Sequence, residues 1–138
     1  MRARKARETD LPRIVELTAS LGLDYPGMEG DALWVAEDEK GRIVGAVALK
    51  RHPDCFELCA LGVEPASRGR GVARALVEAL MAGAPGPVHL ATVIPRFFES
   101  CGFERTFIVP RAFIDKWRTA WCDGCDRRLC TIMLRKTS

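Results

Sequence analysis

The 138-residue sequence contains no apolar run that approaches the roughly 18 residues needed to span a membrane. The basic segment 1–10 is not followed by an apolar stretch, so we expect no secretory signal. The formal net charge is only +3 and the arginines are spread along the chain, whereas nucleic-acid-binding domains usually carry a concentrated basic stripe. Repeats, low-complexity tracts and linkers are also missing. These absences predict one soluble, cytoplasmic domain, residues 1–138, that binds neither membranes nor nucleic acids.

Two nucleotide-binding motifs are absent as well. No Gly-Lys-Ser or Gly-Lys-Thr follows the glycine-rich segment, which argues against a P-loop and its magnesium nucleotide. The segment also lacks the Gly-x-Gly-x-x-Gly pattern of dinucleotide-binding folds. It contains instead Arg68-Gly69-Arg70-Gly71, at the point where an apolar run gives way to a helical pattern.

Hydrophobic periodicity predicts an α/β protein with helices interspersed among the strands of one sheet. A helix is expected from Thr9 or Asp10 to Gly22, and residues 1–7 fit either an edge strand or a frayed tail. Further strands are expected at 33–37, 43–49, 56–63, 88–93, 103–109 and 131–134, the first two forming a hairpin. Further helices are expected at 71–81, 95–101 and 110–121.

The glycine-rich turn has the composition of a phosphate-binding site. Glycine allows a tight backbone turn and lets a ligand approach the N–H groups closely. The first N–H groups of a helix have no acceptor within it, and the helix dipole adds positive potential there. Arg68 and Arg70 would add guanidinium donors. An ordinary turn with solvated arginines is the alternative interpretation.

The run "LGVEPASRGRGVARALVEAL" resembles the acetyl-coenzyme A motif of the GNAT superfamily of N-acetyltransferases, Arg/Gln-x-x-Gly-x-Gly/Ala. Downstream, "PRFFESCGFERT" resembles the "FYEKLGF" segment of the same family. The order of the expected elements also agrees over nearly the whole chain. The resemblance implies a GNAT fold, with a central mixed, mostly antiparallel sheet flanked by helices, and transfer of an acetyl group from acetyl-coenzyme A to an amine.

The resemblance implies roles for three groups of residues. Backbone groups of Leu61, Gly62 and Val63 would pair with the pantetheine arm, and the Val63 N–H would polarise the thioester carbonyl. Phe98 would contact the cofactor at a position where many members carry a tyrosine that protonates the leaving thiolate. The pyrophosphate would bind the turn and the start of the following helix, through Arg68, Gly69, Arg70, Gly71, Val72 and Ala73.

The amine must lose a proton before it can attack, so the reaction needs a base. Glu57 is the best candidate, because it lies on the motif strand among apolar neighbours. A solvent-facing or substrate-binding Glu57 is the alternative. His52, in a turn, is expected to be a surface histidine. His89 is expected to be structural, or to line the acceptor pocket.

The segment "WCDGCDRRLC" places Cys122, Cys125 and Cys130 close together, which allows a zinc site, a disulfide or free thiols. Cys55, Cys59 and Cys101 are expected to be small buried hydrophobic residues. The tail resembles single-domain GNAT proteins of the N-acetylglutamate-synthase-like kind, which implies a small primary amine, such as an amino acid, as acceptor and allows a homodimer. Two alternatives stay open: a catalytically weak acyl-coenzyme A sensor of the same fold, since Phe98 lacks a hydroxyl, and a metal-stabilised interaction module.

Overall fold

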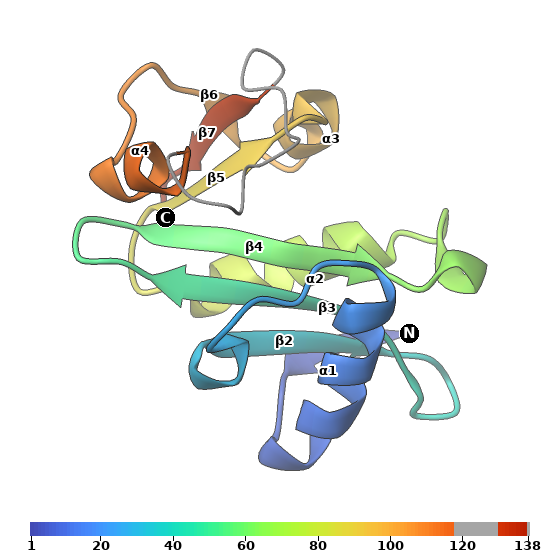
Figure 1. The fold of residues 1–138 in the computed structure, drawn as a ribbon. Coiled ribbons are helices and arrows are strands. Elements are labelled where there is room, and N and C mark those ends of the chain that lie inside the picture. The colour runs from blue at the N-terminus through green and yellow to red at the C-terminus, as the bar shows by residue number, and fades with distance from the viewer. Residues whose placement is uncertain (118–129, 138) are drawn as a thin grey trace. The chain divides into compact units, whose positions relative to one another are not determined.

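The computed structural model describes residues 1–117 and 130–137 (Figure 1). Its strands are β1 (Arg2–Lys5), β2 (Ala32–Glu37), β3 (Ile43–Arg51), β4 (Phe56–Val63), β5 (Val88–Thr92), β6 (Glu104–Arg105) and β7 (Thr131–Arg135). Its α-helices are α1 (Leu11–Ser20), α2 (Val72–Gly83), α3 (Pro95–Ser100) and α4 (Arg111–Trp117). Short 3-10 turns are η1 (Glu8–Asp10), η2 (Met28–Gly30) and η3 (Pro65–Ser67).

The chain forms two compact units. Unit 1 consists of Met1–Lys50 and Leu58–Ala84, and unit 2 consists of Arg51–Glu57 and Pro85–Ser138. The tip of the β3–β4 connection, residues 51–57, therefore belongs to unit 2, whereas most of each strand belongs to unit 1.

The strands form a mixed sheet in the order β1-β2-β3-β4-β5-β7-β6. The pairs β1–β2, β2–β3, β5–β7 and β6–β7 are antiparallel. The pair β4–β5 is parallel and joins Phe56 to Val88 and Glu57 to His89, all within unit 2. A mixed, mostly antiparallel sheet with flanking helices is thus confirmed.

The side chains of β2 point alternately to its two faces, and in unit 1 both faces are buried. Leu33 and Val35 pack in one core cluster with Ile14 and Leu17 of α1. Trp34 points the other way, because a Cβ built on Gly83 of α2 would lie 2.8 Å from its ring. Figure 1 shows α1 in front of these strands and α2 behind them. The helices of unit 1 therefore cover opposite faces.

One expected strand is largely wrong. Of residues 103–109, only Glu104–Arg105 form a strand. After it, the Ile108 N–H donates to Thr106 Oγ1 at 3.2 Å, and the Phe107 side chain is 100% exposed. A local side-chain bond replaces the sheet ladder here. The helix expected at 110–121 is seen as α4, and its remainder lies outside the described residues. Of residues 1–7, which were expected to form an edge strand or a frayed tail, Arg2–Lys5 form the edge strand β1.

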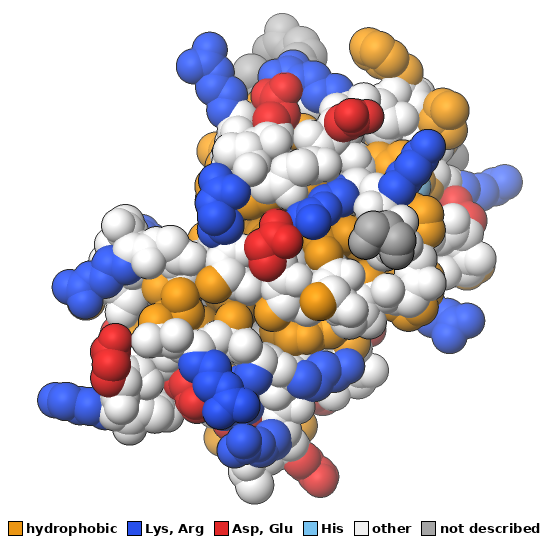
Figure 2. All heavy atoms as spheres, turned by 180° about the vertical axis from the view of Figure 1, so that it is seen from behind, with side chains coloured by type: hydrophobic (Ala, Val, Ile, Leu, Met, Phe, Trp, Pro, Cys, Tyr) orange, Lys and Arg blue, Asp and Glu red, His pale blue; other side chains and the backbone are white. Residues whose placement is uncertain are grey.

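The surface charges are dispersed on the face that Figure 2 presents, where acidic side chains lie among the lysines and arginines. That face carries no continuous basic stripe. In the part of the chain that the structure describes, no helix is long and apolar enough to cross a membrane.

Candidate functional site

The glycine-rich turn joins β4 to α2 in unit 1. Gly69 and Gly71 have φ of +79° and +78°, in the left-handed region that side-chain-bearing residues rarely adopt. Gly71 is the N-cap of α2, and the Ala75 N–H donates to its carbonyl at 3.1 Å. The N–H groups of the first turn before Ala75 have no acceptor within the helix. Apart from the chain neighbours, no described atom lies within 4 Å of a Cβ built on either glycine, so the space beside both glycines is open.

The two arginines of the turn differ in their contacts. Arg68 Nε donates to the Val63 carbonyl at 3.0 Å, which fastens the turn to the end of β4. Arg70 is exposed and makes no hydrogen bond or ion pair with another described residue. One guanidinium thus shapes the turn, and the other is available to an anionic ligand.

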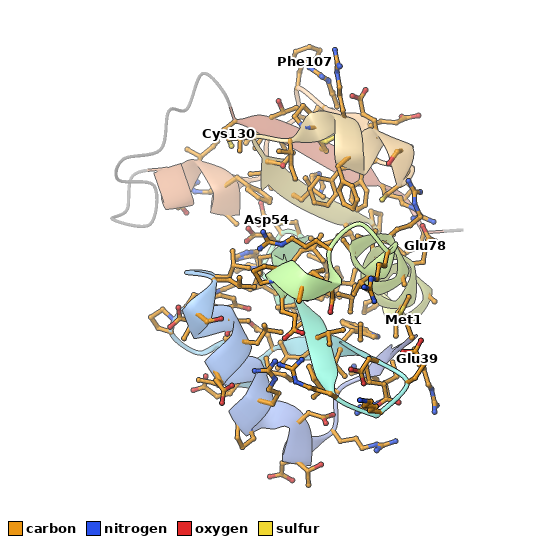
Figure 3. All side chains as sticks on the ribbon, turned by 90° about the vertical axis from the view of Figure 1, so that its right-hand side faces the viewer. Met1, Glu39, Asp54, Glu78, Phe107 and Cys130 are labelled. Atoms are coloured by element: carbon orange, nitrogen blue, oxygen red, sulfur yellow. The ribbon has the colours of Figure 1, made fainter. Side chains whose placement is uncertain are left out.

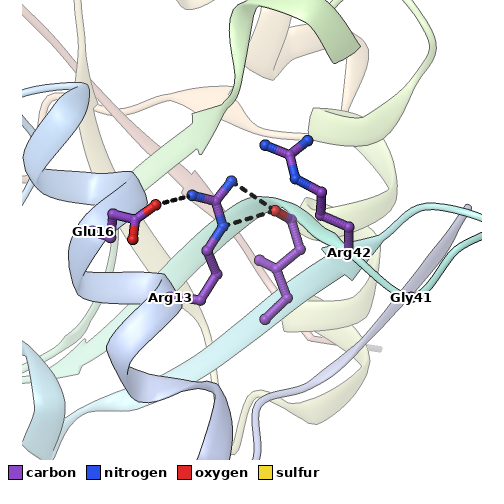
Figure 4. A pocket seen from close by; sticks show the side chains of 5 residues that line it. Arg13, Glu16, Gly41 and Arg42 are labelled. Atoms are coloured by element: carbon purple, nitrogen blue, oxygen red, sulfur yellow. Dashed lines mark hydrogen bonds and ion pairs between the residues drawn. The ribbon is translucent and has the colours of Figure 1, made fainter.

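Glu64, directly after β4, anchors the start of the turn. Its carboxylate accepts hydrogen bonds from Arg42 Nη1 at 2.6 Å and from Arg13 Nη2 at 3.1 Å. The hydrogen bond from Arg42 is the main cause that holds the pKa of Glu64 below its usual value. Arg13 also donates to the Ile43 carbonyl and to Glu16, which Figure 4 shows. This charged network of α1, β3 and the turn gives no signal in the sequence.

β4 is distorted just before the residues implied to bind the pantetheine arm. Ala60 has φ of +53°, and no other non-glycine residue in the described ranges has positive φ. Such a conformation costs alanine about 1–2 kcal/mol. Two residues on, a Cβ built on Gly62 would lie 2.6 Å from Leu23 Cδ1 and 2.8 Å from Leu21 Cδ1. β4 is therefore bent at Ala60 and closely covered at Gly62.

Glu57 lies in unit 2 and is the one charged residue among the described side chains that is buried, with 3% of its surface exposed. His52 Nε2 lies 2.8 Å from Glu57 Oε1. The expectation of a surface histidine is wrong, because the His52 side chain is only 18% exposed. The turn at residues 52–55 brings the two together, with the His52 N–H donating to the Cys55 carbonyl at 2.8 Å.

His89 is the partner of Glu57 in the parallel ladder of β4 and β5. Its Nδ1 is buried and has no hydrogen-bond partner among the described residues. Burial lowers the pKa of His89, and the nearby Asp54 charge opposes this shift. The centroid of the Phe113 ring lies 6.5 Å from that of His52 and 6.3 Å from that of His89.

Asp54 attaches the start of α4 to this turn. Its Oδ2 accepts a hydrogen bond from the Arg111 N–H at 2.8 Å, and Figure 3 labels its position. Burial, helped by the charges of Asp54 and Glu57, raises the pKa of the Cys55 thiol to about 11. Cys55 is therefore a thiol rather than a thiolate at neutral pH, which makes it a poor nucleophile.

Tyr25, the only tyrosine of the chain, is held by three neighbours in unit 1. Its hydroxyl donates to Asp31 Oδ2 at 2.6 Å and lies 3.5 Å from Cys59 Sγ. Lys50 Nζ lies 4.7 Å from the ring centroid. Burial is the main cause that raises the pKa of Tyr25 above its usual range, so this hydroxyl gives up its proton reluctantly.

Phe98 is buried in unit 2, with 6% of its surface exposed. Its ring meets Phe97 and Phe103 edge to face, at centroid distances of 5.0 and 5.8 Å. The position where many GNAT members carry a tyrosine is therefore part of an aromatic cluster in this chain. Contact of Phe98 with the cofactor stays a prediction.

The late cysteines are only partly described. Cys122 and Cys125 lie outside the described residues, and Cys130 is half-buried. Within residues 1–117 and 130–137, no group of three or more His, Cys, Asp or Glu side chains could hold a metal ion. Of the three cysteines expected to be buried, Cys101 is buried, whereas Cys55 and Cys59 are half-buried.

Known proteins share this fold. A Mycobacterium tuberculosis protein in complex with CoA has a TM-score of 0.71 and 24% identity, covering 99% of each chain. The N-acetylglutamate synthase of Neisseria gonorrhoeae, with CoA and N-acetyl-glutamate, has a TM-score of 0.74 and 20% identity over 99% of this chain and 35% of that one. An acetyltransferase of the GNAT family from Staphylococcus aureus has a TM-score of 0.73 and 15% identity, covering 99% of each chain. These likenesses confirm the predicted GNAT fold.

Sequence comparison identifies the family. The L-2,4-diaminobutyric acid acetyltransferase of Chromohalobacter salexigens is 48% identical over 69 residues, which cover 46% of this chain and 36% of that protein. The chain thus spans about a third of the length of this curated relative. The model of the acetyltransferase (GNAT) domain matches residues 29–105, from η2 through the glycine-rich turn to β6. The chain therefore belongs to the GNAT acetyltransferase family, as its two motifs predict.

Proposed function

We propose that this chain transfers the acetyl group of acetyl-coenzyme A to a primary amine of a small molecule, an amino acid in particular. The observation that carries the proposal is the turn before α2, where Gly69 and Gly71 have positive φ and the space beside both is open. Membership of the GNAT family supports the same donor. The names of the relatives support an amino-acid acceptor, since one acetylates L-2,4-diaminobutyric acid and another is an N-acetylglutamate synthase.

The binding residues follow from the turn and the distorted strand. The pyrophosphate would accept hydrogen bonds from backbone N–H groups between Arg68 and Ala73 and from the Arg70 guanidinium. The backbone of β4 beyond Ala60, at Leu61, Gly62 and Val63, would pair with the pantetheine arm. A Val63 N–H that polarises the thioester carbonyl would stabilise the oxyanion that forms in the transition state.

The reaction needs a proton acceptor and a fate for the thiolate. Glu57, which is hydrogen-bonded to His52, would accept the proton of the amine. Phe98 carries no hydroxyl, so the coenzyme A thiolate takes its proton from water. A catalytically weak acyl-coenzyme A sensor is the second candidate, and the buried, apolar surroundings of Phe98 favour it.

An acceptor screen separates the two. Acetyl-coenzyme A consumption is measured with single amino acids, polyamines and peptide N-termini, and includes L-glutamate and L-2,4-diaminobutyrate. The transferase consumes acetyl-coenzyme A only with its acceptor and yields an N-acetylated product in a mass spectrum. A sensor binds coenzyme A in calorimetry and turns over with none of them. Absence of binding and of turnover would refute both.

Zinc, dimerisation and a cytoplasmic location stay predictions. Zinc at Cys122, Cys125 and Cys130 would raise stability, since metal binding couples to folding. Metal analysis of the purified protein and the melting temperature of Cys122→Ser test this. Bound zinc that is lost in the variant, with a lower melting temperature, supports the site. No zinc and an unchanged melting temperature would leave free thiols.

A further inference from the structure

A cavity of about 560 Å³ lies at the edge of the sheet within unit 2, and we call it the edge cavity. β6 is the outermost strand there and contacts α3 (Figure 1). The volume falls within the range of about 300–1,000 Å³ that small-molecule sites occupy, so the edge cavity has room for more than a single ion. The side chains that line it come from β6, β7 and the residues beside them: Glu104, Arg105, Thr106, Leu134, Arg135 and Lys136.

The lining of the edge cavity carries an excess of positive charge. Arg105, Arg135 and Lys136 are its cationic side chains, and Glu104 is the one acidic side chain among the described lining residues. Glu104 makes no ion pair with another described residue, and Arg105 pairs instead with Glu99 of α3, at 3.5 Å. One carboxylate does not balance three cations, so the edge cavity attracts an anion.

The guanidinium of Arg135 is held in a fixed position in the wall of the edge cavity. Its Nη1 donates to the carbonyl of Cys101, at the C-terminal end of α3, at 2.8 Å. A Cβ built on Gly102 would lie 3.4 Å from Arg135 Nε and 3.6 Å from its Cζ, so the guanidinium lies against the backbone of Gly102. Because arginine stays protonated in proteins, this position carries a permanent positive charge.

The other donors of the edge cavity can adjust to a ligand. The side chains of Arg105 and Glu99 are 55% and 47% exposed, and such a surface ion pair is worth little, so Arg105 can turn to an anion at small cost. Lys136 is exposed and makes no hydrogen bond or ion pair with another described residue. Thr106 Oγ1 accepts from the Ile108 N–H, and its hydroxyl proton remains a donor.

The register of β6 and β7 shows that the edge cavity is lined from both faces of the sheet. Arg105 lies opposite Met133, and Glu104 lies opposite Leu134. Opposite residues project to the same face and side chains alternate along a strand, so Arg105 and Arg135 share one face while Glu104 and Leu134 share the other. A ligand here meets donors from several directions. The tetrahedral oxygens of a phosphate suit this arrangement better than the planar oxygens of a carboxylate.

We propose that the edge cavity binds the phosphate group of a small phosphate monoester other than the coenzyme A donor. Arg105, Arg135 and Lys136 are its charged donors, and the Thr106 hydroxyl is a further donor. A phosphate monoester carries about −1.5 to −2 charges at neutral pH, which complements the excess positive charge of the lining. The inference goes beyond the proposed function and does not depend on it, because every residue that carries it lies in unit 2 and none has a role in acetyl transfer.

The test follows the ¹H–¹⁵N spectrum of the whole chain while glycerol 3-phosphate, inorganic phosphate or succinate is added at constant ionic strength. Glycerol 3-phosphate should cause saturable shifts of the amides of residues 102–106 and 134–136. Succinate should bind at least about 10-fold more weakly, because it lacks a tetrahedral anion. Inorganic phosphate should shift the same amides with lower affinity, because it leaves part of the volume empty.

Four variants show whether the lining residues bind the phosphate. Lys136→Gln and Arg105→Gln should each weaken glycerol 3-phosphate binding by about 10-fold, because each removes a charged donor from an exposed position. Glu104→Gln should strengthen binding by about 3-fold or more, because it removes a repelling carboxylate, and a gain in affinity cannot arise from loss of folding. The matched control is Arg96→Gln, which removes one charge from an exposed position near the start of α3, outside the lining, and should change the affinity by less than about twofold.

Four results would overturn the proposal. The first is the absence of saturable shifts at residues 102–106 and 134–136 in the wild type. The second is an equal loss in Arg96→Gln and Lys136→Gln, which would show only general attraction of anions to the surface. The third is binding of succinate or inorganic phosphate as tight as that of glycerol 3-phosphate. The fourth is a shift of the same amides by coenzyme A but not by 3′-dephospho-coenzyme A, which would assign the edge cavity to the donor.

Discussion

Replacing Gly71 by glutamate tests whether the glycine-rich turn binds the diphosphate. Gly71 has φ of +78°, and nothing lies within 4 Å of a Cβ built on it among the described residues. The substitution therefore causes no clash, and its effect on folding is the backbone strain, about 1–2 kcal/mol. This lowers the melting temperature of a chain of this size by about 3–6 °C. The variant should stay folded.

The effect on binding is much larger. At an effective dielectric constant of about 20, two like charges about 5 Å apart repel by about 3 kcal/mol. A carboxylate at position 71 beside a diphosphate should thus weaken coenzyme A binding by more than about 100-fold. Gly71→Gln has nearly the same size and strain but no charge, so it should lose clearly less affinity than Gly71→Glu.

Calorimetry with coenzyme A gives the affinities, and circular dichroism gives the melting temperatures. The matched control is Gly41→Glu, in the β2–β3 turn, where φ is +77° and a built Cβ also meets nothing within 4 Å. It should show the same loss of melting temperature and normal coenzyme A affinity. Equal affinities of the wild type and Gly71→Glu would refute the reasoning, and so would equal losses at positions 41 and 71.

Three further predictions concern residues around the site. Ala60→Val should destabilise the fold by about 2 kcal/mol in urea unfolding, because a β-branched residue at φ of +53° is strained; a gain in stability, as valine gives in a regular strand, would contradict the distortion of β4. Burial lowers the pKa of His89 in the folded protein. Its contribution to stability is therefore present above about pH 6.5, the pKa of an unfolded histidine, and is lost as the pH falls towards the pKa of the folded state. Melting temperatures between pH 7.5 and 5.5 should thus vary less in His89→Gln than in the wild type. An equal pH slope in both would show that His89 does not titrate differently on folding. Glu64→Gln should lower the melting temperature, because it weakens the ion pairs with Arg13 and Arg42. Glu39→Gln, at a carboxylate that is 85% exposed, should leave the melting temperature unchanged. A larger loss in Glu39→Gln than in Glu64→Gln would show that the Glu64 ion pairs do not stabilise the fold.

The sequence predicted those features that depend on neighbouring residues. The turn at Gly69 and Gly71 was predictable, because paired glycines between a strand and a helix indicate positive φ and close backbone approach. The β2–β3 hairpin was predictable from the turn residues around Gly41. Phe103 and the residues after it have strand-like composition, but the hydrogen bond to Thr106 ends the ladder, and composition does not show that bond.

Features that depend on distant contacts could not be predicted. Alanine at position 60 gives no sign of positive φ, because side-chain-bearing residues rarely adopt this conformation and alanine has no special preference for it. His52 and Glu57 are five residues apart, and their bond depends on how the turn at Cys55 closes. A turn histidine read from sequence alone is therefore assigned to the surface.

The most direct test of the central claim is a crystal structure of the chain with bound coenzyme A. The account predicts the diphosphate at the amides between Arg68 and Ala73, with the pantetheine arm along Leu61 to Val63. Coenzyme A bound elsewhere, with this turn free of ligand, would contradict it.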